Sequence, residues 1–153
     1  MNEVEAASAK AAFIAATDEL IAAGRETGNW MSDQALQERN PVAHGFADGL
    51  YTRQIEMPAG QVIVGKVHLK SGAFFLLSGS MDILSESGVM RVSAPHHGVT
   101  PAGTQRVVRT VTDCVYVTVH ATDLTDTDEI EAELTSVDFD HPAVRHMAQG
   151  ELT

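Results

Sequence analysis

The sequence is poor in several residue types, and each shortage excludes a class of protein. It has one cysteine, Cys114, which cannot form an internal disulfide, as is usual in a reducing cytoplasm. No apolar run approaches the ~20 residues that a membrane-spanning helix needs. The first residues, Met1–Glu5, are acidic and lack the basic start of a signal peptide. We therefore expect a soluble, cytoplasmic protein.

Basic residues are scarce as well. Ten lysines and arginines stand against 21 aspartates and glutamates, so the formal net charge is -11. Such a charge repels nucleic acids and anionic membranes, and no local basic patch is evident, so neither is an expected partner. Apolar residues make up 44% and charged residues 20% of the 153 residues, a composition typical of one globular domain.

The N-terminal part has a helical pattern. The alanine-rich segment 5–24 carries apolar residues at helical spacing, and Gly24 and Gly28 are expected to end the helix. A second short helix is predicted over Asp33–Arg39. It should end at this point, because the residue before Pro41 is disfavoured in the helical conformation.

From Gly49 onward, short apolar segments alternate with turn residues, which predicts strands. About eight such segments in close succession indicate an antiparallel sandwich or barrel. Valines next to Cys114 place its thiol in a buried strand, where it would be inert. Capping oxygens near Thr125 predict a C-terminal helix, followed by a loosely packed tail. The predicted strands are Leu50–Met57, Gln61–Leu69, Ala73–Leu77, Ser80–Leu84, Val89–Ser93, Gly98–Thr100, Gln105–Val111 and Cys114–His120.

An ordered set of short motifs runs through residues 41–134. It includes Pro41-Val42, His44-x-Phe46, Gly49-Leu-Tyr-x-Arg53, Met57-Pro-Ala-Gly60, Gly65-Lys-Val-His68, Ala94-Pro95, Ala102-Gly-Thr-Gln-Arg106, Asp113-Cys-Val, Val117-Thr-Val-His120 and Asp126-Thr-Asp-Glu-Ile-Glu131. This set resembles the cupin-like proteins of tailed phages and prophages, in the RmlC-like cupin superfamily. The resemblance implies a mainly β protein, a cupin-type antiparallel β-barrel (jelly roll). An N-terminal helical arm (1–40), the barrel (41–122) and a C-terminal helix with tail (123–153) would form a single domain.

Cupins in general bind a metal through His-x-His followed by Glu, and through Pro-x-Gly-x-x-His. The resemblance places these four ligand positions at Lys66, His68, Gly72 and Arg106. Of these four positions, only His68 keeps the kind of residue that the cupin motifs carry there. Phage-type relatives often carry a second histidine four residues after the first, and that position is again Gly72. The chain therefore departs from the usual metal-binding pattern.

Alternation along strands suggests a different kind of site. Residues two apart in a strand share a face, so several basic side chains are expected at the mouth of the barrel. Arginine offers a fork of donors that matches carboxylate or phosphate, and lysine adds a point charge. The predicted ligand is therefore a small anionic molecule. The predicted ligand-binding residues are Arg53, Lys66, His68, Arg106 and His120.

Other interpretations of these residues stay open. A strand histidine often has only a structural hydrogen bond, Lys66 fits a solvated position, and Arg106 fits an ion pair with one of the many carboxylates. The cofactor is either absent or a single divalent metal, which needs about three converging ligands. His44, His68 and His120 are the candidates, although they come from separate segments.

Three functions follow from these observations. The first is a phage-type cupin that binds a small anion in the cytoplasm of the host cell. The second is a metal-dependent cupin enzyme, such as an isomerase, lyase or dioxygenase, although no nucleophile elbow, phosphate loop or dinucleotide fingerprint is present. The third is a structural or virion-associated module with the alanine-rich helix as an arm. The resemblance also implies a homo-oligomer, a dimer or larger.

Overall fold

The computed structural model describes residues 2–136, so the predicted C-terminal tail lies outside the described residues. Helix α1 (Glu3–Glu26) extends the predicted helix by two residues at each end. The Asn2 side chain accepts a hydrogen bond from the Glu5 amide at 2.8 Å, and the Glu5 carboxylate accepts one from the Asn2 amide. Helix α2 (Asp33–Arg39) has the predicted bounds. No helix among the described residues is long and apolar enough to cross a membrane.

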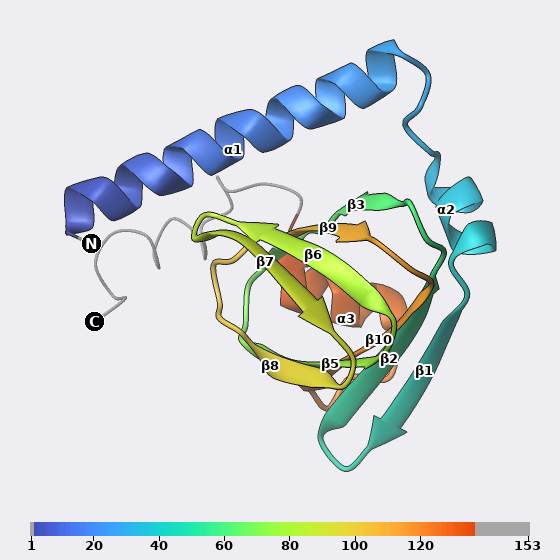
Figure 1. Ribbon diagram of the computed structural model, residues 1–153. Coiled ribbons are helices and arrows are strands. Elements are labelled where there is room, and N and C mark those ends of the chain that lie inside the picture. Colours follow the sequence, from blue (N-terminus) through green and yellow to red (C-terminus); the bar gives the residue numbers. More distant parts are fainter. Residues whose placement is uncertain (1, 137–153) are drawn as a thin grey trace.

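The rest of the described chain is mainly antiparallel β structure (Figure 1). A five-stranded sheet has the order β1-β2-β10-β5-β8 and faces a four-stranded sheet of order β3-β9-β6-β7, while β11 and β4 form a separate pair. The strands and the third helix are β1 (Val42–Ala47), β2 (Leu50–Met57), β3 (Val62–Val64), β4 (Val67–His68), β5 (Gly72–Ser78), β6 (Ser80–Ser85), β7 (Gly88–Ser93), β8 (His96–Thr100), β9 (Val107–Thr110), β10 (Cys114–Ala121), α3 (Thr127–Leu134) and β11 (Thr135–Ser136).

This arrangement confirms the jelly-roll prediction but corrects the barrel. The hydrogen-bonded ladder stops at β1 and β8 in one sheet and at β3 and β7 in the other, so the sheets face each other without closing. Two strand predictions also need correction. The predicted strand Gln61–Leu69 is interrupted at Gly65, whose amide bonds to the Arg106 carbonyl. Strand β1 is absent from the predicted strands, because its residues show no apolar run. Its pairing with β2 makes this segment a strand.

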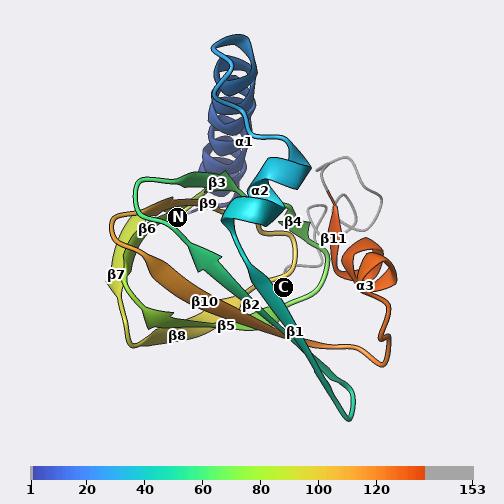
Figure 2. The ribbon, with the colours of Figure 1, turned by 90° about the vertical axis from the view of Figure 1, so that its right-hand side faces the viewer.

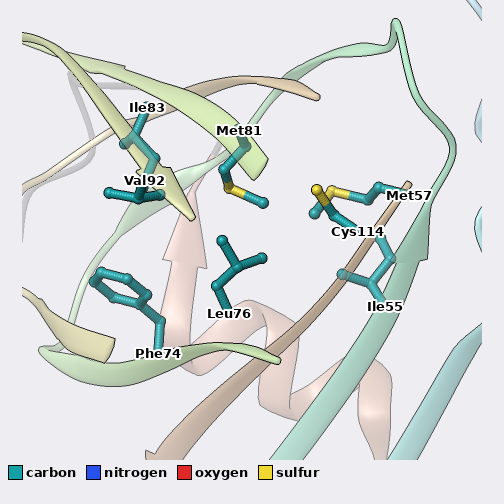
Figure 3. Close-up of a cluster of buried hydrophobic side chains, with 8 residues drawn as sticks. All are labelled: Ile55, Met57, Phe74, Leu76, Met81, Ile83, Val92 and Cys114. Atoms are coloured by element: carbon teal, nitrogen blue, oxygen red, sulfur yellow. The ribbon is translucent and has the colours of Figure 1, made fainter. Parts of the chain in front are cut away.

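A hydrophobic core fills the space between the two sheets (Figure 3). Its side chains come from every second residue of a strand, because successive side chains point to opposite faces of a sheet. Cys114 belongs to this core, is 2% exposed and donates its thiol hydrogen to the Ser80 carbonyl. Burial raises the pKa of the Cys114 thiol, in keeping with a structural role. The core consists of Ile55, Met57, Phe74, Leu76, Met81, Ile83, Val92 and Cys114.

Helix α3 covers one end of the sandwich (Figure 2). Ile130 and Leu134 pack on Tyr51 of β2 in a second buried cluster. The Asp126 carboxylate caps the helix by accepting the Asp128 and Glu129 amides, both at 3.0 Å. Together with β11, which pairs with β4, this packing holds the helix against the segment that carries His68.

Candidate functional site

Two histidines meet inside the molecule at the end that α3 covers. The rings of His68, from β4, and His120, from β10, lie 5.8 Å apart between centroids and are inclined by 29°. His120 is 7% exposed and His68 is half-buried. The Nδ1 atom of each ring is buried and has no hydrogen-bond partner among the described residues. Because buried polar atoms are nearly always paired, these two atoms mark a place for a bound group or water.

Gly72 makes room for this pair. A Cβ atom at Gly72 would lie 2.4 Å from Cε1 and 2.5 Å from Nδ1 of His120. The imidazole of His120 therefore fills the space that a side chain at position 72 would need. Gly72 is also the position where the resemblance places a further metal ligand. In this protein the His120 ring occupies the space that the side chain of such a ligand would take.

The segment after β8 brings an arginine to the histidines. The His68 amide donates to the Thr104 carbonyl at 2.9 Å, and the Gly103 amide donates to the His68 carbonyl at 2.7 Å. The Gly65 amide donates to the Arg106 carbonyl at 2.9 Å. These backbone bonds fix the segment that carries Arg106 beside β4.

Two guanidinium groups line the interior next to the histidines. Arg53 of β2 stands opposite Thr118 of β10, on the inward face of the sheet. Arg106 donates from Nη1 to the Thr100 hydroxyl at 2.8 Å, and its Cζ lies 4.8 Å from the centre of the Phe74 ring. Within residues 2–136, neither guanidinium forms an ion pair with a carboxylate. Both guanidiniums are half-buried.

Burial, together with the neighbouring positive charges, keeps the two histidines neutral. Burial is the main cause that lowers the pKa of His68 to about 4, and the nearby His120 and Arg106 lower it further. The pKa of His120 is also lowered, mainly by burial and to a smaller extent by the positive charge of Arg53. Burial lowers the pKa of Arg53 itself. At neutral pH the site therefore combines two positive guanidiniums with two uncharged imidazoles.

Three neighbours of this site were not identified from the sequence. Tyr116 contacts Arg106, and burial raises the pKa of its phenol despite the arginine nearby. Phe74 stacks on Tyr116 with 5.7 Å between ring centroids, and Thr100 binds Arg106. Strand alternation is a signal that could have found Tyr116, because it shares a face of β10 with His120. Thr100 and Phe74 come from strands whose partners the sequence does not specify.

The structure brings together four of the residues predicted from the sequence, namely Arg53, His68, Arg106 and His120. Lys66 lies elsewhere. Its ammonium is exposed on the surface and forms an ion pair with Glu131 of α3. Alternation between Lys66 and His68 does not hold, because Lys66 lies in the break between β3 and β4.

His44 also lies apart from the two inner histidines. It is exposed on β1, with its Nδ1 2.7 Å from the Tyr51 hydroxyl. His96 and His97, which precede the predicted strand Gly98–Thr100, both belong to β8. His96 is half-buried against Phe74, and His97 is exposed on the other face.

Comparisons with known proteins identify the fold. No family model matches the sequence, and no curated protein matches it significantly. Among solved structures, a cupin 2 domain-containing protein from Halorhodospira halophila aligns with a TM-score of 0.51 and 10% identity, over 63% of this chain and 77% of that one. The fold is a cupin jelly roll. An acetylacetone dioxygenase from Acinetobacter johnsonii aligns with a TM-score of 0.47 and 16% identity, over 60% and 71% of the two chains.

The resemblance stated from the sequence places metal-ligand positions in this chain, so the fit of a metal to the jelly roll needs a test. The described residues contain no group of three His, Cys, Asp or Glu side chains placed to hold a metal ion. Of the four positions that correspond to cupin ligands, Arg106 bears a positive charge that repels a cation, and Gly72 has no donor. His68 and His120 alone do not form a usual site, so the residues present do not fit a cupin-type metal centre.

Proposed function

We propose that this protein binds a small oxyanion, a carboxylate or phosphate compound, between Arg53, Arg106, His68 and His120. The observation that carries the proposal is a pair of inner guanidiniums that form no ion pair with a carboxylate of residues 2–136. They lie beside two imidazoles whose buried Nδ1 atoms have no hydrogen-bond partner within the same residues. A guanidinium donates parallel hydrogen bonds that match the oxygens of carboxylate and phosphate. An anion would compensate the charge and complete the hydrogen bonds at once.

The electrostatics of the site also support an anion. The pKa of His68 is low because burial and neighbouring positive groups disfavour its charged form. A bound anion would offset the neighbouring positive charges, so binding would raise the pKa of His68 and favour proton uptake. Affinity should then increase as the pH falls from 7 toward 5.5.

The proposed role is binding without chemistry. An imidazole with a pKa as low as that of His68 is a weak general base. No carboxylate of residues 2–136 pairs with the inner arginines to supply another. By resemblance to phage-encoded cupins, such a protein would act in the cytoplasm of an infected host cell. That setting stays a prediction.

Isothermal titration calorimetry with inorganic phosphate, citrate and adenosine monophosphate tests the proposal. Arg53→Gln and Arg106→Gln remove one inner charge each, and Arg39→Gln on the exposed face of α2 is the matched control. We expect at least one anion to bind, and each inner variant to weaken its affinity about tenfold or more, the usual value of a charged hydrogen bond. Absence of binding by all three anions, or an equal loss in Arg39→Gln, would overturn the proposal.

A further inference from the structure

A cleft adjoins the proposed anion site on the side of helix α1. It lies between the N-terminal half of α1, the turn that joins β6 to β7, and the segment that follows β8 (Figure 1). Its volume is about 390 Å³. Small-molecule sites usually measure between about 300 and 1,000 Å³. The cleft is therefore large enough to hold an organic molecule, and not only a simple ion.

Arg106 connects this cleft to the inner site. Its guanidinium donates to the Thr100 hydroxyl and lies against the Phe74 ring, and the same residue lines the cleft. The cleft wall is also joined to the strand of His68, because the Gly103 amide donates to the His68 carbonyl at 2.7 Å. An oxyanion bound at Arg106 therefore lies next to the cleft, and the rest of its molecule has room there.

The cleft is basic within an acidic protein. Lys10 of α1 is half-buried at its wall and donates from Nζ to the Gly103 carbonyl at 3.3 Å, which holds the ammonium at the cleft. Within residues 2–136, the cleft is lined by two basic side chains, Lys10 and Arg106, and one acidic side chain, Glu86. The whole sequence has the opposite balance, with ten basic and 21 acidic residues. Such a local reversal of charge favours an anionic group.

Other residues of the cleft suit a carbon chain. Val99, Pro101 and Ala102 line it as well, and Val99 is 63% exposed. Apolar groups gain free energy when they leave water together. A molecule in the cleft therefore meets apolar side chains together with two positive groups, Arg106 and Lys10, that come from different elements of the fold.

We propose that the protein binds an extended dianion, with one oxyanion between the inner arginines and a second anionic group beside Lys10. This inference rests on the proposed function and adds the class of ligand to it. Arg106 contributes to the binding of any anion in the inner site, whereas the ammonium of Lys10 acts as a point charge on the second group. Glu86 lines the same cleft and repels that group. Lys10 is therefore a specificity-determining residue that selects ligands with two anionic groups.

Isothermal titration calorimetry at neutral pH with two pairs of matched probes tests the proposal. Glutarate and glutaramate have the same length, but glutaramate has a neutral amide in place of one carboxylate. Glycerate and glycerol, each phosphorylated on a terminal carbon, both carry a phosphate, but only the first also carries a carboxylate. In at least one pair, we expect the probe with the additional carboxylate to bind about tenfold more tightly, the usual value of a charged hydrogen bond.

Variants of the cleft assign this preference to Lys10. Lys10→Gln should reduce the affinity for the probe with the additional carboxylate about tenfold and leave the affinity for its partner probe unchanged. Lys10→Arg keeps the charge and should keep the preference. Glu86→Gln removes the repulsion and should raise the affinity for the probe with the additional carboxylate. Arg25→Gln is the matched control, because it removes one positive charge from the exposed last turn of the same helix, and it should leave both affinities unchanged.

Circular dichroism checks that each variant is folded, and the rise expected in Glu86→Gln decides if Lys10→Gln is unfolded. Equal affinities within both pairs, or no binding of these probes by a protein that binds phosphate, would overturn this proposal and leave the proposed function standing. A preference that survives in Lys10→Gln, or that Arg25→Gln also removes, would overturn it as well. Absence of binding by these probes and by phosphate, citrate and adenosine monophosphate would instead refute the proposed function itself, and this inference with it.

Discussion

The neutral state of His68 makes the protein sensitive to mild acid in a predictable direction. Its pKa is about 4 in the folded protein, against 6.5 in an unfolded chain. Between these values the unfolded state binds the proton and the folded state does not. The free energy of unfolding therefore falls as the pH drops from 6.5 toward 4, and is unaffected by this group above 6.5. At pH 5 the loss is about 2 kcal/mol, from 1.36 kcal/mol for each unit of pKa.

Urea denaturation at pH 7.5 and at pH 5 measures this loss. In His68→Gln the titrating group is absent, so the difference between the two pH values should shrink by about 2 kcal/mol relative to the unaltered protein. His97→Gln is the matched control, since His97 is exposed on the opposite face of the sheet, and it should keep the full difference. Without added anion, both measurements report the empty site.

An equal loss of stability in His68→Gln and in the unaltered protein would refute the reasoning. It would mean that His68 accepts its proton in the folded state at ordinary pH, and that neither burial nor the positive charge of Arg106 acts on it. Repeating the series with a bound anion adds a second check. An anion next to His68 should reduce the acid loss, because it stabilises the charged imidazole.

Three further predictions concern packing and metal content. Asn40→Ala should lower the free energy of unfolding by about 1–3 kcal/mol in urea denaturation. In the unaltered protein the side-chain amides of Asn40 and Gln61 exchange hydrogen bonds of 2.7 and 2.8 Å. The substitution removes both bonds and leaves the buried Gln61 amide without this partner. Gly72→Ala should displace the His120 ring, lowering stability by about 1–3 kcal/mol in the same assay and weakening anion binding in calorimetry. Elemental analysis of untagged protein should find far less than one zinc, iron, manganese or nickel atom per chain, and a stoichiometric metal would contradict our assignment of the site.

Local patterns were enough to predict most of the elements. Turn residues on both sides of Leu50–Met57, and the proline after Asp33–Arg39, limited these segments to the bounds that the structure shows. Strand β1 was missed because its residues Val42–Ala47 have little apolar character, and only the ladder with β2 makes them a strand. Pairing of that kind depends on residues elsewhere in the chain, so a local pattern does not reveal it.

For the site, the sequence by itself determined the chemistry and the tertiary structure decided the geometry. Strand periodicity sufficed to put His120 on one face of β10 with Tyr116 and Thr118, because alternation is a property of each strand alone. The packing of the two sheets decided that this face points inward. The break between β3 and β4 turned Lys66 outward to Glu131, and no periodicity crosses such a break. Likewise, the close approach of His120 to Gly72 arises where two strands meet in the fold. Contact between distant segments is set by sheet order and register, which the residues of one segment do not specify.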